Sequence, residues 1–210
     1  MPGEPSQISP LGKLLPGHVR WPRRRRPPWL PAASERRDCA PRPRVIWGMS
    51  VEIDHADLVA QAYYASMGFA VPAAFGIQAV TGLRPLVLLG DGAFQMTGWK
   101  LGNCQRYGFD PIVVVLNNRG WEMLRTFDPN FQFNDLSDSH FADLARSLGG
   151  NGVRVRSRRE LSRALETAWD NGGSFQLIEV VPDRGVTSDT LSRFVTALSA
   201  KNRYSNTGQR

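Results

Sequence analysis

Two short polar motifs in the middle of the chain contain residue types that bind metal ions and phosphates. They are Gly90-Asp91-Gly92 and Asn117-Asn118-Arg119-Gly120. A carboxylate at Asp91, an amide oxygen at Asn118 and an exposed carbonyl at Gly120 make up the all-oxygen set that magnesium or calcium prefers. Flanking glycines let a backbone approach an anion closely, and the N-terminal amides of a following helix attract it. An isolated Gly-Asp-Gly is more often a plain turn, and Asn118 could simply cap a helix or loop, so the motifs indicate a site only if they lie together.

The elements around the motifs are expected to bring them together. Residues 86–89 and 112–116 are short, fully apolar runs, which are typical of strands buried on both faces of a parallel sheet. Each motif follows one of these runs, and the stretch between the motifs includes a predicted helix over 97–107 that ends at Gly108. One strand–helix unit returns the chain to the same sheet edge, so the two loops should be neighbours.

The same alternation of strand and helix extends along the rest of the chain. We expect helical structure within 55–82 and helices over 139–148, 158–169 and 187–198, with strands at 153–155 and 175–181. Ser157 and Glu160 form a capping box before the helix at 158. The predicted fold class is therefore α/β, a parallel sheet with helices on both faces.

Charge and proline divide the chain into two regions. Of the 26 basic and 19 acidic side chains, ten and three lie in the range 1–48, which leaves sixteen of each and no net charge for the remainder. Ten of the fifteen prolines lie in the same range. We therefore predict a disordered Pro/Arg-rich leader over 1–50 and one folded domain over 51–210.

The basic leader admits three interpretations. Its arginine run at 23–26 could contact nucleic acid, which would make the chain a non-catalytic nucleic-acid-binding protein, although we expect no nucleic-acid partner. An organellar transit peptide is disfavoured because the prolines oppose an amphipathic helix. We favour a leader that is not a selected part of the protein, for instance an upstream or out-of-register translation.

Two further observations bear on the compartment. No apolar run reaches the ~18 residues that a membrane span needs, so no membrane role is expected. Two cysteines, Cys39 and Cys104, are too few for a disulfide framework, and we expect a cytoplasmic protein.

The two motifs and their spacing resemble the signature of thiamine diphosphate enzymes. Four further segments, at 63–69, 94–99, 121–125 and 188–191, resemble the phenylpyruvate and indolepyruvate decarboxylases. The resemblance covers about residues 53–199 and implies the cofactor-binding C-terminal domain of a 2-oxo acid decarboxylase, a carbon–carbon lyase.

The resemblance also implies roles for individual residues. Asp91, the side chain of Asn118 and the carbonyl of Gly120 would bind Mg²⁺. The diphosphate of thiamine diphosphate would lie against the backbone of Gly90, Gly92 and Ala93, with the amides of Gly92 and Ala93 as donors.

One family position differs in this chain. Many 2-oxo acid decarboxylases carry a catalytic glutamate where Leu124 stands here. An apolar residue at this position is similar to the arylpyruvate branch, so Met123 and Leu124 are candidates for the substrate pocket. The alternative is that both are core residues of a helix.

The family activates its cofactor with a glutamate on a separate pyrimidine-binding domain, contributed across a dimer interface. We expect that glutamate to be absent here, so no catalytic residue is assigned and the isolated chain is expected to be a truncated, inactive part of a homo-oligomeric enzyme. The alternative is the small subunit of a two-chain decarboxylase or synthase, whose partner would supply the pyrimidine-binding domain.

Other notable side chains are given ordinary interpretations. Cys104 is expected to pack as a small apolar group. Arg125 is expected to form a surface ion pair, and His55 and His140 to be plain surface or packing residues. The arginines at 154, 156, 158 and 159 alternate with valines and are expected to lie on a solvated edge.

Overall fold

The structure is a computed structural model. It describes residues 44–47, 57–60, 64, 66–128, 130–185, 193 and 196–197. The arginine run, His55, the predicted helix over 187–198 apart from three residues, and the resemblance segment at 188–191 lie outside these ranges.

The described strands form a single parallel sheet. Their order across the sheet is β2-β1-β3-β4-β6-β5, and every adjacent pair is parallel. The strands are β1 (Arg44–Trp47), β2 (Asp57–Ala60), β3 (Leu86–Gly90), β4 (Ile112–Leu116), β5 (Asn151–Val155) and β6 (Gln176–Val180).

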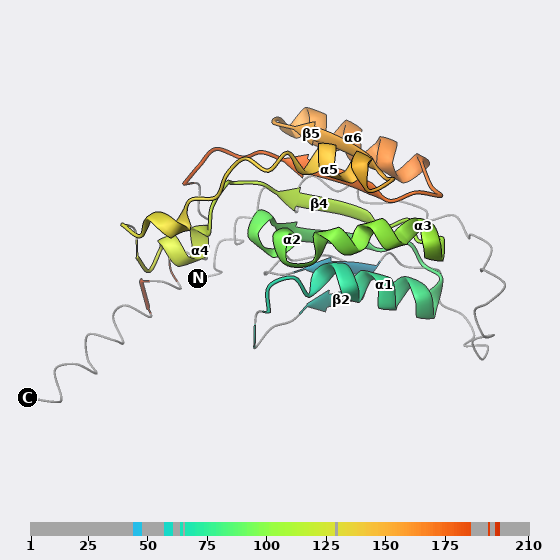
Figure 1. Cartoon of the computed structure of the whole chain (residues 1–210), viewed down its shortest axis with the longest axis horizontal. Helices are drawn as coiled ribbons and strands as arrows, with labels where there is room; N and C mark the ends of the chain where they lie inside the picture. The colour runs from blue at the N-terminus through green and yellow to red at the C-terminus, as the bar shows by residue number, and fades with distance from the viewer. Residues whose placement is uncertain are drawn as a thin grey trace, which may run out of the picture.

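Helical segments connect these strands. They are α1 (Ala70–Thr81), α2 (Asp91–Thr97), η1 (Gly98–Asn103), α3 (Cys104–Tyr107), α4 (Glu122–Arg125), η2 (Gln132–Asn134), α5 (Phe141–Ser147) and α6 (Arg158–Asp170). α1, α2, α3 and α5 lie in front of the sheet in Figure 1, and α6 lies behind it.

The sheet has an apolar core on each face because successive residues of a strand point to opposite sides. One core joins alternate residues of β3, β4 and β6 to α1, α2, α3 and α5. In this core the ring centroids of Phe94 and Phe141 are 4.9 Å apart. The other core joins the intervening strand residues to one face of α6. These two layers confirm the predicted α/β fold with helices on both faces.

Several local predictions are confirmed. β4 matches its apolar run, and β3, β5 and β6 lie within two residues of their predicted bounds. Gly108 ends α3 in the left-handed conformation at φ 65°, which a glycine adopts without strain. The capping box is present: Ser157 Oγ accepts from the Glu160 amide, and the Glu160 carboxylate accepts from the Ser157 amide.

Two predictions at the start of the domain are wrong. β1 lies within the range 1–50 assigned to a disordered leader, where its four residues pair with both β2 and β3. β2 lies within the stretch 55–82 expected to be helical, and the helix itself begins only at Ala70. Both strands are four residues long, too short to show a pattern of their own beside prolines and alanines.

The helix expected from residue 97 begins earlier, at Asp91. An acidic residue in the first turn favours a helix start because it interacts with the positive end of the helix dipole. Gly90 is the extended residue before it, so the Gly-Asp-Gly motif is the beginning of α2 rather than a separate loop. Among the described residues, no helix is both long and apolar enough to cross a membrane.

Candidate active site

The two polar motifs lie side by side at the carboxyl edge of the sheet. Gly90 at the end of β3 is in register with Leu116 at the end of β4, so the segments that follow both strands emerge together. Figure 1 shows the β4 arrow pointing toward the side of the molecule where α4 lies. This is the sheet edge at which parallel α/β proteins bind ligands.

Asp91, Asn118 and Gly120 share one hydrogen-bonded cluster. The Gly120 amide lies 3.2 Å from Asp91 Oδ2 and 3.2 Å from Asn118 Oδ1, so a single N–H joins the two side chains. The Gly92 amide donates to Asp91 Oδ1 at 2.8 Å. The structure therefore brings together the three residues that the sequence singled out as metal ligands.

Burial dominates the electrostatics of Asp91. The residue is only 4% exposed, and this desolvation raises the pKa of its carboxyl above the usual 3.8. Hydrogen bonds from the backbone amides of Gly92, Gly120 and Arg119 act in the opposite direction and are outweighed. A carboxylate held out of water in this way gains from a cation placed beside it.

The glycines of the first motif differ in their surroundings. A Cβ at Gly90 would meet nothing within 4 Å, whereas a Cβ at Gly92 would lie 2.7 Å from the Trp121 ring. Trp121 therefore packs over the beginning of α2, a contact that sequence reasoning missed. Ala93 is the third residue of α2, where an amide has no acceptor within its own helix.

Asn117 belongs to a buried polar network that sequence reasoning also missed. Its Nδ2 donates to Glu179 Oε1 at 2.6 Å and to Asp138 Oδ1 at 3.2 Å. The other oxygen of Glu179 accepts from the Ala142 amide at 3.0 Å. Glu179 is fully buried, and a carboxylate between the apolar residues Ile178 and Val180 of β6 was the available signal.

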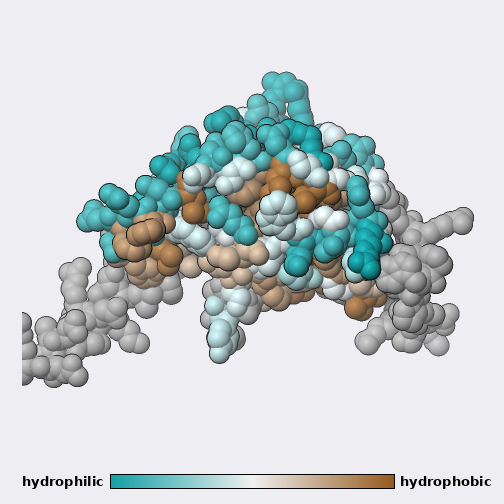
Figure 2. Space-filling model, viewed as in Figure 1, coloured by the Kyte–Doolittle hydropathy of each residue, from teal (hydrophilic) through white to brown (hydrophobic). Residues whose placement is uncertain are grey.

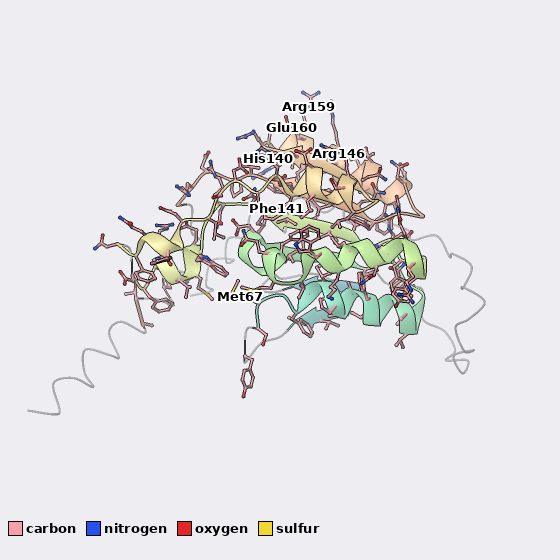
Figure 3. The ribbon with its side chains drawn as sticks, in the orientation of Figure 1. Met67, His140, Phe141, Arg146, Arg159 and Glu160 are labelled. Atoms are coloured by element: carbon pink, nitrogen blue, oxygen red, sulfur yellow. The ribbon has the colours of Figure 1, made fainter. Side chains whose placement is uncertain are left out.

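Arg154 corrects the prediction of a solvated arginine edge. Its guanidinium binds both oxygens of Asp138 at 2.7 and 2.6 Å and lies 3.6 Å from Glu179 Oε1. Its Nη1 also lies 2.8 Å from Nδ1 of His140. His140, labelled in Figure 3, directly precedes α5. β5 pairs with β6 in the sheet, and this pairing places Arg154 beside Glu179. The arginines at 156, 158 and 159 stay exposed.

Met123 and Leu124 lie on α4, beyond the end of the sheet. They are 40% and 52% exposed, so they are not the core residues that the alternative interpretation required. Glu122, beside them, is buried against the Arg125 guanidinium, which also binds Asp135 as an ion pair. Figure 2 shows hydrophobic atoms exposed at this end of the molecule. Other exposed apolar residues of α4, η2 and the segment between them are Phe127, Phe131 and Phe133.

The cluster fits a hard divalent cation. Asp91 and Asn118 contribute oxygens, and no hydrogen bond to the Gly120 carbonyl oxygen is found among the residues that the structure describes. The described part of the chain contains no group of three His, Cys, Asp or Glu side chains arranged for a metal, so a site here would depend on amide and backbone oxygens. Such a donor set suits magnesium or calcium rather than zinc.

The fold and the site define a doubly covered parallel α/β domain with an oxygen-lined cluster at its carboxyl edge. The chain belongs to the family described as thiamine pyrophosphate enzyme, C-terminal TPP binding domain, whose model matches residues 48–180. Thiamine pyrophosphate is another name for thiamine diphosphate, so the family match confirms the cofactor class expected from the two motifs.

Curated relatives carry the same kind of domain. The chain is 58% identical over 147 residues to an indole-3-pyruvate decarboxylase of Azospirillum brasilense, a match that covers 70% of this chain and 27% of the relative. It is 34% identical over 131 residues to an alpha-keto-acid decarboxylase of Mycobacterium avium strain 104, covering 60% and 23%. This chain thus spans about a quarter of the length of these relatives.

Solved structures show the same fold at lower identity. A thiamine diphosphate-dependent 4-hydroxybenzoylformate decarboxylase of Rhodococcus jostii RHA1 superposes with a TM-score of 0.59 at 24% identity, covering 65% of this chain and 27% of that one. A benzoylformate decarboxylase of Polynucleobacter necessarius superposes with a TM-score of 0.59 at 21% identity, covering 72% and 32%.

Proposed function

We propose that this chain is the thiamine diphosphate- and Mg²⁺-binding part of an arylpyruvate decarboxylase. The observation that carries the proposal is the cluster in which the Gly120 amide joins Asp91 to Asn118 at the carboxyl edge of the sheet. The relative that is 58% identical is named an indole-3-pyruvate decarboxylase, which favours indole-3-pyruvate over phenylpyruvate as the substrate.

Each residue of the cluster has a defined task in this proposal. The Asp91 carboxylate, the Asn118 amide oxygen and the Gly120 carbonyl would hold Mg²⁺, because all three are hard oxygen donors. Gly90 would let the chain turn next to the diphosphate, and the start of α2, with the amides of Gly92 and Ala93, would face its negative charge. The Gly92 amide already donates to Asp91 Oδ1, so it holds the metal ligand in place as well.

Thiamine diphosphate, when bound, would supply the electron sink for breaking the bond between the carboxylate and the 2-oxo carbon of the substrate. The chain's own residues would hold the cofactor and shape the surface around it. Met123 and Leu124, both exposed on α4, would contact the aromatic ring of the substrate. A carboxylate in place of Leu124 would be unfavourable beside that ring unless it were paired.

The proposal includes a partner and a compartment. A pyrimidine-binding domain or subunit would supply the glutamate that activates the cofactor, and the complete enzyme would be a homo-oligomer. The exposed apolar residues of α4 and η2 lie at the end of the molecule where such a partner would meet the cofactor. The cytoplasm is the proposed compartment, because the chain has only two cysteines.

Calorimetry on the full chain tests the site. Thiamine diphosphate titrated in the presence of Mg²⁺ should bind, and Asp91→Ala should remove detectable binding because the cation loses the carboxylate ligand proposed for it. Asp170→Ala, at the exposed end of α6, removes the same charge away from the cluster and should bind normally. Equal affinity of the Asp91→Ala variant and the unaltered chain would overturn the assignment.

A further inference from the structure

The Asn117–Gly120 segment is fixed in an unfavourable backbone conformation. Arg119 has a positive φ of 61°, in the left-handed region that residues other than glycine rarely adopt. Such a conformation persists only where the surrounding structure determines it. The Arg119 carbonyl accepts from the Leu136 amide and from Arg184 Nη2, both at 2.9 Å, which secures one end of the segment.

The other end of the segment is secured by β6. The Asn117 amide donates to the Val180 carbonyl at 2.8 Å, and the Asn117 side chain donates to Glu179. Asn117 is fully buried, and its Oδ1 has no hydrogen-bond partner among the residues that the structure describes. Its side chain is therefore oriented by the carboxylates that accept from Nδ2, chiefly Glu179 at 2.6 Å.

Glu179 uses both of its carboxyl oxygens as acceptors. Its two oxygens accept from two different N–H donors, the Asn117 side chain and the Ala142 backbone amide at the beginning of α5. A glutamine has one oxygen and one NH₂ group, so one of these donors would face another donor. Arg154, 3.6 Å from Glu179 Oε1, supplies the opposite charge that a buried carboxylate requires.

We propose that Glu179 is a positioning residue for the cofactor site. It acts through Asn117 to hold Asn118 and Gly120 in reach of Asp91, where the Gly120 amide joins both side chains. The inference rests on the proposed function, since it assigns the segment a cation to position. It adds a residue from β6, a strand that contributes no ligand itself.

The test compares Glu179→Gln with Asp110→Asn, which alters another buried carboxylate at the opposite end of the strands. Asp110 lies before β4 and also accepts from one side-chain amide, Gln78 Nε2 at 2.7 Å, and from one backbone amide, Gly173 N at 3.0 Å. Asp110→Asn therefore disrupts the same pattern of bonds far from the cluster. Both variants should lower the melting temperature of the full chain.

Only Glu179→Gln should change the site. At a temperature where circular dichroism shows both variants folded, its Kd for thiamine diphosphate with Mg²⁺ should rise at least about 10-fold, the scale of losing a partner of a metal ligand. Hydrogen exchange at the Gly120 amide should also accelerate in the ligand-free chain. Asp110→Asn should retain the wild-type Kd and exchange rate.

Asn117→Ala provides a second route to the same conclusion if Glu179→Gln does not fold. It should weaken binding and accelerate exchange at Gly120 similarly, and the double variant should be no worse than either single variant, since both break one link. Unchanged Gly120 exchange in folded variants would overturn the positioning role. If the unaltered chain binds no cofactor, the proposed function fails, while the exchange comparison still decides whether Glu179 fixes the segment.

Discussion

Asp91 keeps an ionisable carboxylate out of water at the first residue of a helix. Burial raises the pKa of its carboxyl, so the charged form is less favourable here than it is in water. Hydrogen bonds from the Gly92 and Gly120 amides offset part of the free-energy cost of burying the charged carboxylate. A bound cation would offset the rest of that cost. This arrangement is what the proposed role of Asp91 as a cation ligand would require.

Gly92 shows how closely the site is packed. A methyl group there would lie 2.7 Å from the Trp121 ring, so we expect Gly92→Ala to displace the ring and lower the free energy of unfolding by about 1–3 kcal/mol. Urea unfolding of the full chain measures this loss.

The matched control is Gly76→Ala, on α1, where a Cβ meets nothing within 4 Å. It should stabilise the chain by up to about 1 kcal/mol, because alanine favours a helix more than glycine does. Two variants of equal stability would show that Trp121 moves aside freely.

The sequence alone predicted the members of the cluster but not what supports them. Asp91, Asn118 and Gly120 follow apolar runs that indicate two strands, and one strand–helix unit is enough to make them neighbours. Glu179 and Arg154 could not be placed, because their contacts depend on β6 lying beside β4 although α5, β5 and α6 come between the two strands in the chain. Pairing of distant strands is decided by the packing of the whole sheet.

At the scale of elements, the predictable parts were those with a strong local pattern. The apolar runs of β3 and β4 can bury their side chains on both faces only inside a sheet. The capping box marks the point at which α6 begins. β1 and β2 were missed because four residues carry too little pattern to distinguish a strand from its surroundings. They are strands because β1 pairs with β3 and β2 pairs with β1.

The capping box gives α6 a pH dependence. The Glu160 carboxylate accepts from the Arg156 amide at 2.7 Å and the Ser157 amide at 3.1 Å, which lowers its pKa below the usual 4.5. A lowered pKa in the folded state means that this stabilisation is complete above pH 4.5 and is lost as the pH falls through the lower, folded value. Glu160→Gln should therefore melt below the unaltered chain at pH 7, with the difference shrinking toward pH 3.

Glu166→Gln is the control for this prediction. Glu166 is exposed on the same helix and lies outside the capping box, so its replacement removes an equal charge without breaking the cap. Its effect on the melting temperature should be small at both pH values. A Glu160→Gln deficit that persists undiminished at pH 3 would mean that the carboxylate charge is not what stabilises the cap.

At the scale of the whole molecule, β1 joins the outermost strand to the rest of the sheet. It lies between β2 and β3 and pairs with β3 from Val45↔Leu86 to Trp47↔Leu88. Removing residues 1–43 takes away nine basic and three acidic side chains but no described strand. We expect that truncation to leave the melting temperature and the cofactor affinity unchanged.

Removing residues 1–50 should have a different result. It deletes β1, separates β2 from β3, and should lower the free energy of unfolding by several kcal/mol, a large share of the ~5–15 kcal/mol typical of a domain. Parallel thermal melts of the two truncated chains measure the difference. If both melt alike, the pairing of β1 does not stabilise the sheet.

The position of β6 beside β4 also has a consequence for the order in which the protein is made. Asn117 and Glu179 are 62 residues apart in the chain, so at ~5–20 residues per second a ribosome completes Asn117 roughly 3–12 s ahead of the residue that anchors it. During that interval the left-handed conformation at Arg119 lacks the Glu179 anchor. We therefore expect a nascent chain to gain affinity for its cofactor only after β6 has emerged, which makes ligand binding a late event of folding rather than a template for it.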